Sequence, residues 1–248
     1  MGNLISDISP RKILSSYIEN VSLPKAISLL NSEGYEIASA EQKVQLLLQE
    51  GFDSPIASER SVISDRILFV MNKGKFWIKK MPNSFLDNKE NYTKNGMCYH
   101  SDNQLYQILD NSESLYEQKN INALDKILEN SFPLHEIHNI IVYPQNFKEG
   151  DIEDVESREV ISYVFGDFAK DYADFWQSKT KNSLMRITIP ITSFLRKACI
   201  KRRVNAISTP IIFSGNNQDF GLFGHLSLSC YNCERIRGVK DALDYSNN

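Results

Sequence analysis

Three residues of the sequence have the types and the order that a cysteine nucleophile needs. Cys98 closes a polar stretch, and the apolar residues that follow it predict a helix. At a helix N-terminus the dipole favours a thiolate, and the first backbone N–H groups would form an oxyanion hole. His225 opens a predicted strand much later in the chain and is the expected general base. Asp241, or alternatively Asp244, would orient the imidazole ring.

This order of a cysteine, a Gly-His pair and an aspartate resembles the papain-like cysteine proteases. It is similar in particular to those that bacteria inject into host cells, several of which are acylated. The resemblance covers order and spacing, and it implies Cys98 as nucleophile, His225 as base and Asp241 as orienting acid. The implied activity is acyl transfer from an amide or thioester, as a protease or acyltransferase acting on a host or partner protein. The sequence departs from that family after Cys98, where neither tryptophan nor a small residue follows, and upstream, where no glutamine-containing oxyanion segment matches.

A second enzymatic interpretation uses His100. The Tyr99-His100 pair, ahead of a predicted helix, is similar to the ADP-ribosyltransferase pattern, in which a histidine at a strand end binds the nicotinamide ribose. Glu156 or Glu159 would then be the catalytic glutamate. The common nucleotide-binding and α/β-hydrolase motifs are absent from the sequence.

Metal binding is not expected. Cys230 and Cys233 form a single C-x-x-C pair, and a zinc ion needs two further ligands. The only plausible ones are Cys98 and His100, which lie far away in the sequence. We therefore predict neither a metal site nor a cofactor.

The N-terminus predicts attachment to a membrane. Residues 1–6 match M-G-x-x-x-[ST], so Gly2 could accept a myristoyl chain after removal of the methionine. The sequence has no secretory signal and no apolar run long enough to span a membrane. The expected location is the cytosolic face of a membrane, reached within a host cell by a route that needs no signal peptide. One acyl chain binds a membrane only marginally, so a second signal is expected.

A basic cluster could be that second signal. Five cations lie within eight positions of a chain with a net charge of −3: Arg196, Lys197, Lys201, Arg202 and Arg203. Each would contribute about 1 kcal/mol near anionic lipid. No aromatic residues are interleaved with them, so nucleic acid is not an expected partner. A non-enzymatic, lipid-anchored adaptor that binds anionic membrane and a protein partner is thus the alternative to an enzyme, and a merely solvated helix face is the simplest explanation of the cluster.

The composition is that of a soluble globular protein. The 248 residues are 42 % hydrophobic and 24 % charged, and a chain of this length buries a core without disulfides or metals. The four cysteines fit a reducing compartment. Collagen-like, disordered and disulfide-scaffold classes are excluded.

Hydrophobic periodicity predicts helices first and strands later, hence an α+β fold. Residues 1–60 are expected to form a helical N-terminal section, with a helix near 13–18, one after Ser22 and Pro24, and one that starts at a Ser39–Gln42 capping box. Residues 61–248 would form the α+β main domain, a mixed and mainly antiparallel sheet with flanking helices. Its predicted elements are a hairpin turning at 72–75, strands at 137–143, 184–191, 210–213 and 225–230, and helices at 160–176 and 193–203.

Overall fold

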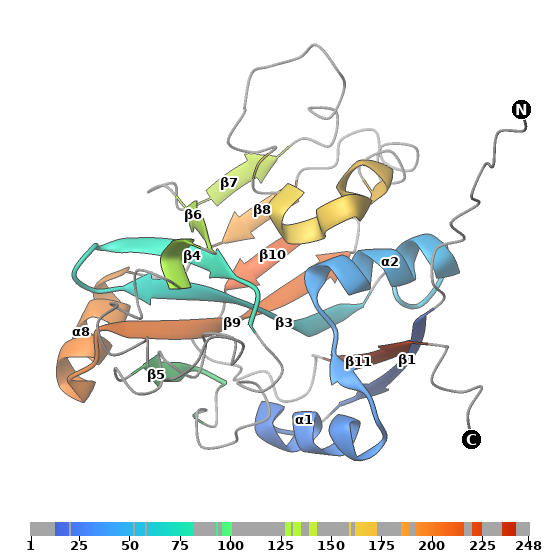
Figure 1. Cartoon of the computed structure of the whole chain (residues 1–248), viewed down its shortest axis with the longest axis horizontal. Helices are drawn as coiled ribbons and strands as arrows, with labels where there is room; N and C mark the ends of the chain where they lie inside the picture. The colour runs from blue at the N-terminus through green and yellow to red at the C-terminus, as the bar shows by residue number, and fades with distance from the viewer. Residues whose placement is uncertain are drawn as a thin grey trace, which may run out of the picture.

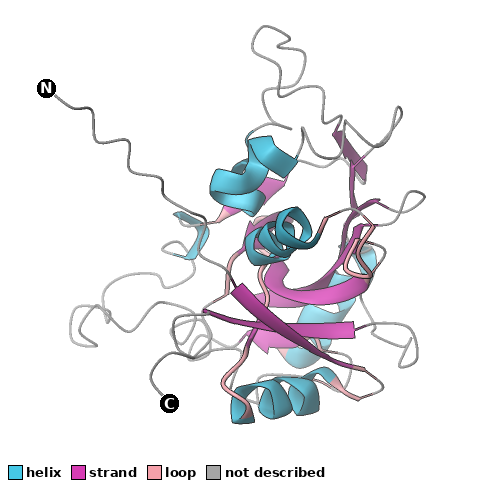
Figure 2. Cartoon of the chain, turned by 90° about the vertical axis from the view of Figure 1, so that its right-hand side faces the viewer, coloured by secondary structure: helices cyan, strands magenta, loops and turns pink. Residues whose placement is uncertain are grey.

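The structure is a computed structural model. It describes residues 13–19, 21–51, 53–57, 59–81, 93, 96–100, 127–129, 131–134, 139–142, 159, 162–172, 185–188, 192–215, 220–224 and 235–241. Within these residues one sheet forms the centre of the molecule (Figure 1). Helices lie on both of its faces (Figure 2).

The sheet contains eleven strands among the described residues. They are β1 (Ile13–Ile18), β2 (Glu36–Ile37), β3 (Arg60–Val70), β4 (Lys75–Lys79), β5 (Cys98–His100), β6 (Phe132–Leu134), β7 (Asn139–Val142), β8 (Met185–Thr188), β9 (Ala206–Gly215), β10 (Phe220–Gly224) and β11 (Arg235–Asp241). The helices are α1 (Leu23–Ser32), α2 (Ala40–Glu50), α8 (Thr192–Arg202) and a helical segment at 162–172 that includes the 3-10 turn η4 (Gly166–Phe168).

The strands follow the order β1-β11-β3-β9-β10-β8-β7. Outside this path, β2 pairs with β11, β4 with β3, β6 with β4, and β5 with β9. The pairs β11–β3 and β10–β8 are parallel, and the other pairs are antiparallel. The sheet is therefore mixed, and β3 and β9 are its longest pair of neighbours.

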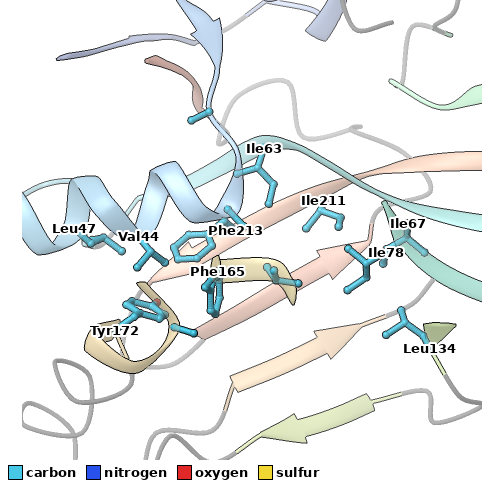
Figure 3. Packing of buried hydrophobic residues seen from close by; sticks show 14 of the residues in the cluster. Val44, Leu47, Ile63, Ile67, Ile78, Leu134, Phe165, Tyr172, Ile211 and Phe213 are labelled. Carbon is cyan, nitrogen blue, oxygen red and sulfur yellow. The ribbon is translucent and has the colours of Figure 1, made fainter. Parts of the chain in front are cut away.

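Strand β3 is buried on both faces because alternate side chains enter two separate cores. Ile63, Ile67 and Phe69 pack into the core under α2 and the 162–172 helix. Val62 and Leu68 pack into the core against α1. Figure 3 shows the first of these cores, in which residues of α2, β3, β9 and the 162–172 helix meet. The two-residue repeat of a strand accounts for this division.

Local signals explain where α1 and α2 begin and end. Ser39 Oγ accepts a hydrogen bond from Gln42 N at 3.2 Å, and Gln42 Oε1 accepts one from Ser39 N at 2.9 Å. The predicted capping box is therefore confirmed. Gly51, with φ at +82°, ends α2, and Pro24 lies in the first turn of α1.

The predicted fold class is wrong in its helical N-terminal section. Residues 13–18 form the edge strand β1, whose six residues all pair with β11, and β2 also pairs with β11. The apolar residues of 13–18 fit one face of a short helix as well as they fit a strand. The partner strand that decides between the two lies near the other end of the sequence, so local periodicity could not identify it.

Other predicted elements have different outcomes. The hairpin is confirmed, because β3 and β4 pair antiparallel across residues 71–74. The helix at 193–203 is confirmed as α8, and the strands near 137–143, 184–191 and 210–213 are confirmed by β7, β8 and β9. Residues 225–230 and 101–126 lie outside the described residues, so the strand and the helix predicted there are not tested.

Candidate functional site

Cys98 lies in a strand and not at the start of a helix. It pairs with Ser208 across β5 and β9, and its side chain is 1 % exposed. Burial raises the pKa of the Cys98 thiol, although the charge of Arg66 and a hydrogen bond with Ser208 oppose this effect. Cys98 is therefore a protonated, enclosed thiol at neutral pH, which is the reverse of the exposed thiolate that nucleophilic catalysis requires.

A buried polar cluster surrounds Cys98. His100 Nε2 lies 2.8 Å from Ser208 Oγ, and Arg66 Nε donates to the same oxygen at 3.1 Å. Arg66 also donates to the backbone oxygen of Gly96. Burial, assisted by the positive charge of Arg66, lowers the pKa of His100 to about 3, so its ring is neutral. These contacts join β3, β5, β9 and the segment before β5.

This cluster has residue types that could do chemistry but no access to solvent. His100 and Ser208 are both 0 % exposed, and Arg66 is 1 % exposed. The position of His100 at the end of β5 agrees with a strand-end histidine, but no nicotinamide ribose could reach its ring in this arrangement. Glu159 is exposed on the surface, and Glu156 lies outside the described residues. The geometry of this buried cluster favours a structural role, in which it joins β3, β5 and β9.

Asp241, the expected orienting acid of the predicted triad, is not brought to Cys98. Asp241 is the last residue of β11, whereas Cys98 is on β5, and both β9 and β3 lie between these strands. Three strand spacings alone separate them by at least roughly 14 Å. His225 lies outside the described residues, so the triad remains a prediction. Gly2, Asp244, Cys230 and Cys233 also lie outside them.

A second charged cluster, which the sequence did not reveal, is centred on Glu59. Lys43 Nζ lies 2.9 Å from Glu59 Oε1, and Arg237 Nε donates to the same oxygen at 3.0 Å. Burial alone would raise the pKa of Glu59, but the hydrogen bond from Arg237 and the charge of Lys43 outweigh it and lower the pKa. Burial lowers the pKa of Lys43 to about 8 despite its attraction to Glu59. The cluster links α2 to β11 and is enclosed.

The predicted membrane-binding residues, on helix α8 and directly after it, are exposed to solvent. Leu195 and Cys199 are buried and attach the helix to the core under α2. The five predicted cations are exposed: Arg196, Lys197, Lys201, Arg202 and Arg203. The Arg202 guanidinium also lies over the Tyr99 ring, 5.1 Å from its centroid, which connects α8 to β5.

Two large apolar side chains accompany these cations. Ile200 is 68 % exposed and Phe194 is 48 % exposed. On a helix, Ile200 is the neighbour of Arg196 and Lys197, because residues three and four positions apart lie side by side. The outward face of α8 is thus both basic and apolar. The sequence contained this signal, since Ile200 stands directly before the Lys-Arg-Arg run, but the face that would be exposed was not predictable.

Neither a metal site nor a membrane-spanning helix is found in the described part of the chain. No three His, Cys, Asp or Glu residues among those described gather in a way that could hold a metal ion. No helix within the same residues is long and apolar enough to cross a membrane.

Neither a protein-family model nor a curated protein matches the sequence. A solved structure described as "Accommodation of massive sequence variation in Nanoarchaeota by the C-type lectin fold" matches 94 % of this chain and 100 % of its own chain. The TM-score is 0.55 and the sequence identity is 14 %. The fold of this chain is therefore similar to the C-type lectin fold. The predicted fold class, with its helical N-terminal section, is therefore replaced by a mixed sheet similar to the C-type lectin fold.

Proposed function

We propose that this chain is a binding module that attaches to anionic membranes through α8. The observation that supports this proposal best is the outward face of the helix. The helix exposes four cations together with Ile200 and Phe194, the fifth cation, Arg203, follows directly after it, and Leu195 and Cys199 fix the helix to the core. Such a helix, held to the core on one side, can contact an anionic bilayer through its exposed cations.

The chain as a whole has a net charge of −3, so attraction to an anionic membrane must come from a local group of cations such as this one. Each Lys or Arg close to an anionic bilayer contributes about 1 kcal/mol, so a few cations suffice for measurable attachment. The cations Lys201 and Arg202 also lie in the last turn of α8, where they interact favourably with the helix dipole.

The exposed apolar side chains favour a membrane over a soluble anion. Ile200 would contribute by leaving water for the acyl-chain boundary, which nucleic acid does not offer. An acyl chain on Gly2 would add a second anchor and remains part of this proposal. In Figure 1 the strand β1 lies at the opposite end of the sheet from α8.

The fold and the buried cysteine support a binding module more than a catalyst. The structural neighbour is described as a fold that accommodates massive sequence variation. A framework of that kind can change its exposed residues while keeping its sheet. Cys98, the nucleophile of the enzymatic hypothesis, is 1 % exposed and has a raised pKa.

Vesicle sedimentation tests the proposal. The unacylated protein should bind phosphatidylcholine vesicles that contain phosphatidylserine, and should bind pure phosphatidylcholine far more weakly. Exchanging Lys197 and Lys201 for glutamine together should weaken binding about 30-fold, since two charges near the surface are lost. The matched control exchanges Lys25 and Lys170, two exposed lysines on other elements, and should change binding less than threefold.

The same experiment identifies the results that would reject the proposal. Equal binding to both kinds of vesicle would show that anionic lipid is not recognised. An equal loss in both double variants would show that attraction depends on overall charge and not on α8. Tight binding to an RNA or DNA oligonucleotide without vesicle binding would assign the cations to another partner.

A further inference from the structure

The turn between β3 and β4 lies against α8. It covers residues 71–74, and Gly74 adopts φ at +64°, in the left-handed region, with its N–H donating to Val70 O at 2.8 Å. A Cβ atom placed on Gly74 would lie 2.7 Å from Arg196 Nη2. The Arg196 guanidinium therefore contacts the turn backbone, and two segments that are distant in the sequence become one surface at the end of the sheet (Figure 1).

The turn adds positive charge to this surface. Lys73 and Lys75 flank Gly74, and both are exposed. Residues 71–75 and 192–203 together contain seven cations and no aspartate or glutamate. An anion at this surface would therefore be attracted by cations of both segments.

The arrangement differs from a simple row of cations on a helix. Arg196 contacts the turn at Gly74, which Lys73 and Lys75 flank in the sequence, and Lys197 follows Arg196 in α8. A guanidinium recognises phosphate through two parallel hydrogen bonds, and lysines act as point charges around it. Charges carried by two adjoining elements suit a compact anion with several negative charges better than lipids that carry one charge each.

We propose that the β3–β4 turn and α8 together form a site for a membrane lipid headgroup that carries more than one phosphate monoester. This inference rests on the proposed function, because it specifies which anionic lipid α8 binds. Arg196 is the central contact with phosphate, and Lys73 and Lys75 supply selectivity over lipids of single charge. Ile200 enters the bilayer beside the bound headgroup.

The test compares two vesicles of equal total charge. One contains about 5 % phosphatidylinositol 4,5-bisphosphate and the other about 20 % phosphatidylserine, both in phosphatidylcholine. The wild-type protein should bind the first at least fivefold more tightly. Exchanging Lys73 and Lys75 for glutamine should remove this preference, with a loss of about tenfold on the bisphosphate vesicles and less than threefold on phosphatidylserine. The Lys25 and Lys170 double variant is again the control, and unfolding midpoints verify that every variant is folded.

The outcomes separate this inference from the proposed function. An equal loss on both vesicles in the turn variant, or no loss, overturns the inference while binding through α8 stands. If the Lys197 and Lys201 variant binds both vesicles as tightly as the wild type, the proposed function fails. A third measurement uses soluble inositol 1,4,5-trisphosphate. Binding as tight as that to the bisphosphate vesicles would overturn the assignment to a lipid, and binding at least tenfold weaker supports it.

Discussion

Replacing Asp65 by asparagine is expected to stabilise the protein at neutral pH. Asp65 lies in β3 at the register shift between Ile63 and Arg66, and its side chain is fully buried. Its Oδ2 accepts a hydrogen bond from Ala40 N at 2.7 Å, whereas its Oδ1 is buried without a hydrogen-bond partner. One oxygen thus accepts a hydrogen bond from the first residue of α2, and the other has no hydrogen-bond partner.

Burial raises the pKa of Asp65 from 3.8 to about 6, against the hydrogen bond from Ala40. Among the described residues, the charged groups that act on it are Lys80 and Glu41, which form an ion pair at 2.9 Å, and its own charge acts on Tyr163. A pKa that is higher in the folded state means that folding favours the protonated form. This stabilisation is complete below pH 4 and is lost as the pH rises through 6.

The magnitude follows from the size of this shift. A change of about two pKa units corresponds to about 3 kcal/mol of unfolding free energy that the wild type loses between pH 4 and pH 7. Asparagine has no charge to desolvate, and its oxygen can still accept from Ala40 N. Its amide group replaces Oδ1, an atom that is already unsatisfied, so the additional cost is small. We expect a gain of about 2 kcal/mol at pH 7, most of the linkage energy, and little change at pH 4.

Urea unfolding followed by circular dichroism at pH 4, 5, 6 and 7 measures this difference directly. Asp171→Asn, an exposed carboxylate on the 162–172 helix, is the matched control and should be neutral within about 0.5 kcal/mol at each pH. A variant at Asp65 that is less stable than the wild type at pH 7 would refute the reasoning. It would mean that the ionised carboxylate stabilises the N-terminus of α2 by more than its burial costs.

Two further predictions concern the enclosed clusters. Glu59→Gln should destabilise the protein by about 3–5 kcal/mol in urea unfolding, because it leaves two buried cations without their carboxylate; a change below about 1 kcal/mol would show that water reaches them. Alkylation of Cys98 at pH 7 should be at least about 100-fold slower in the folded protein than in urea, and unchanged in His225→Ala, because the thiol is buried with a raised pKa. Peptide mass spectrometry measures this rate, and rapid alkylation at pH 7 that depends on His225 would support the nucleophile hypothesis instead.

The elements that the sequence predicted correctly are those whose signals are local. The capping box joins Ser39 to a residue three positions away, and the hairpin turn at 72–75 is bounded by apolar runs on both sides. Helix α8 was also predictable, since its pattern is complete within one segment. The strand β1 was not, because its apolar residues do not distinguish a short helix from an edge strand.

The candidate site shows the same division. The cations of α8 could be identified from the sequence because charged residues are exposed by default. The burial of Cys98 could not, since it depends on Ser208 and Arg66 from distant strands. The contact between Gly74 and Arg196 was equally hidden, because only the packed fold brings the turn to the helix.

The position of β11 has a consequence for how the protein folds during synthesis. This strand is inserted between β1 and β3, two strands from the early part of the chain. The ribosome therefore releases both neighbours long before the strand that separates them exists. Until residues 235–241 emerge, the edges of β1 and β3 that β11 will cover have no strand to pair with, and they are open to mispairing and aggregation. A chain stopped before residue 235 would lack an internal strand of its sheet, so late truncations should be as damaging as early ones.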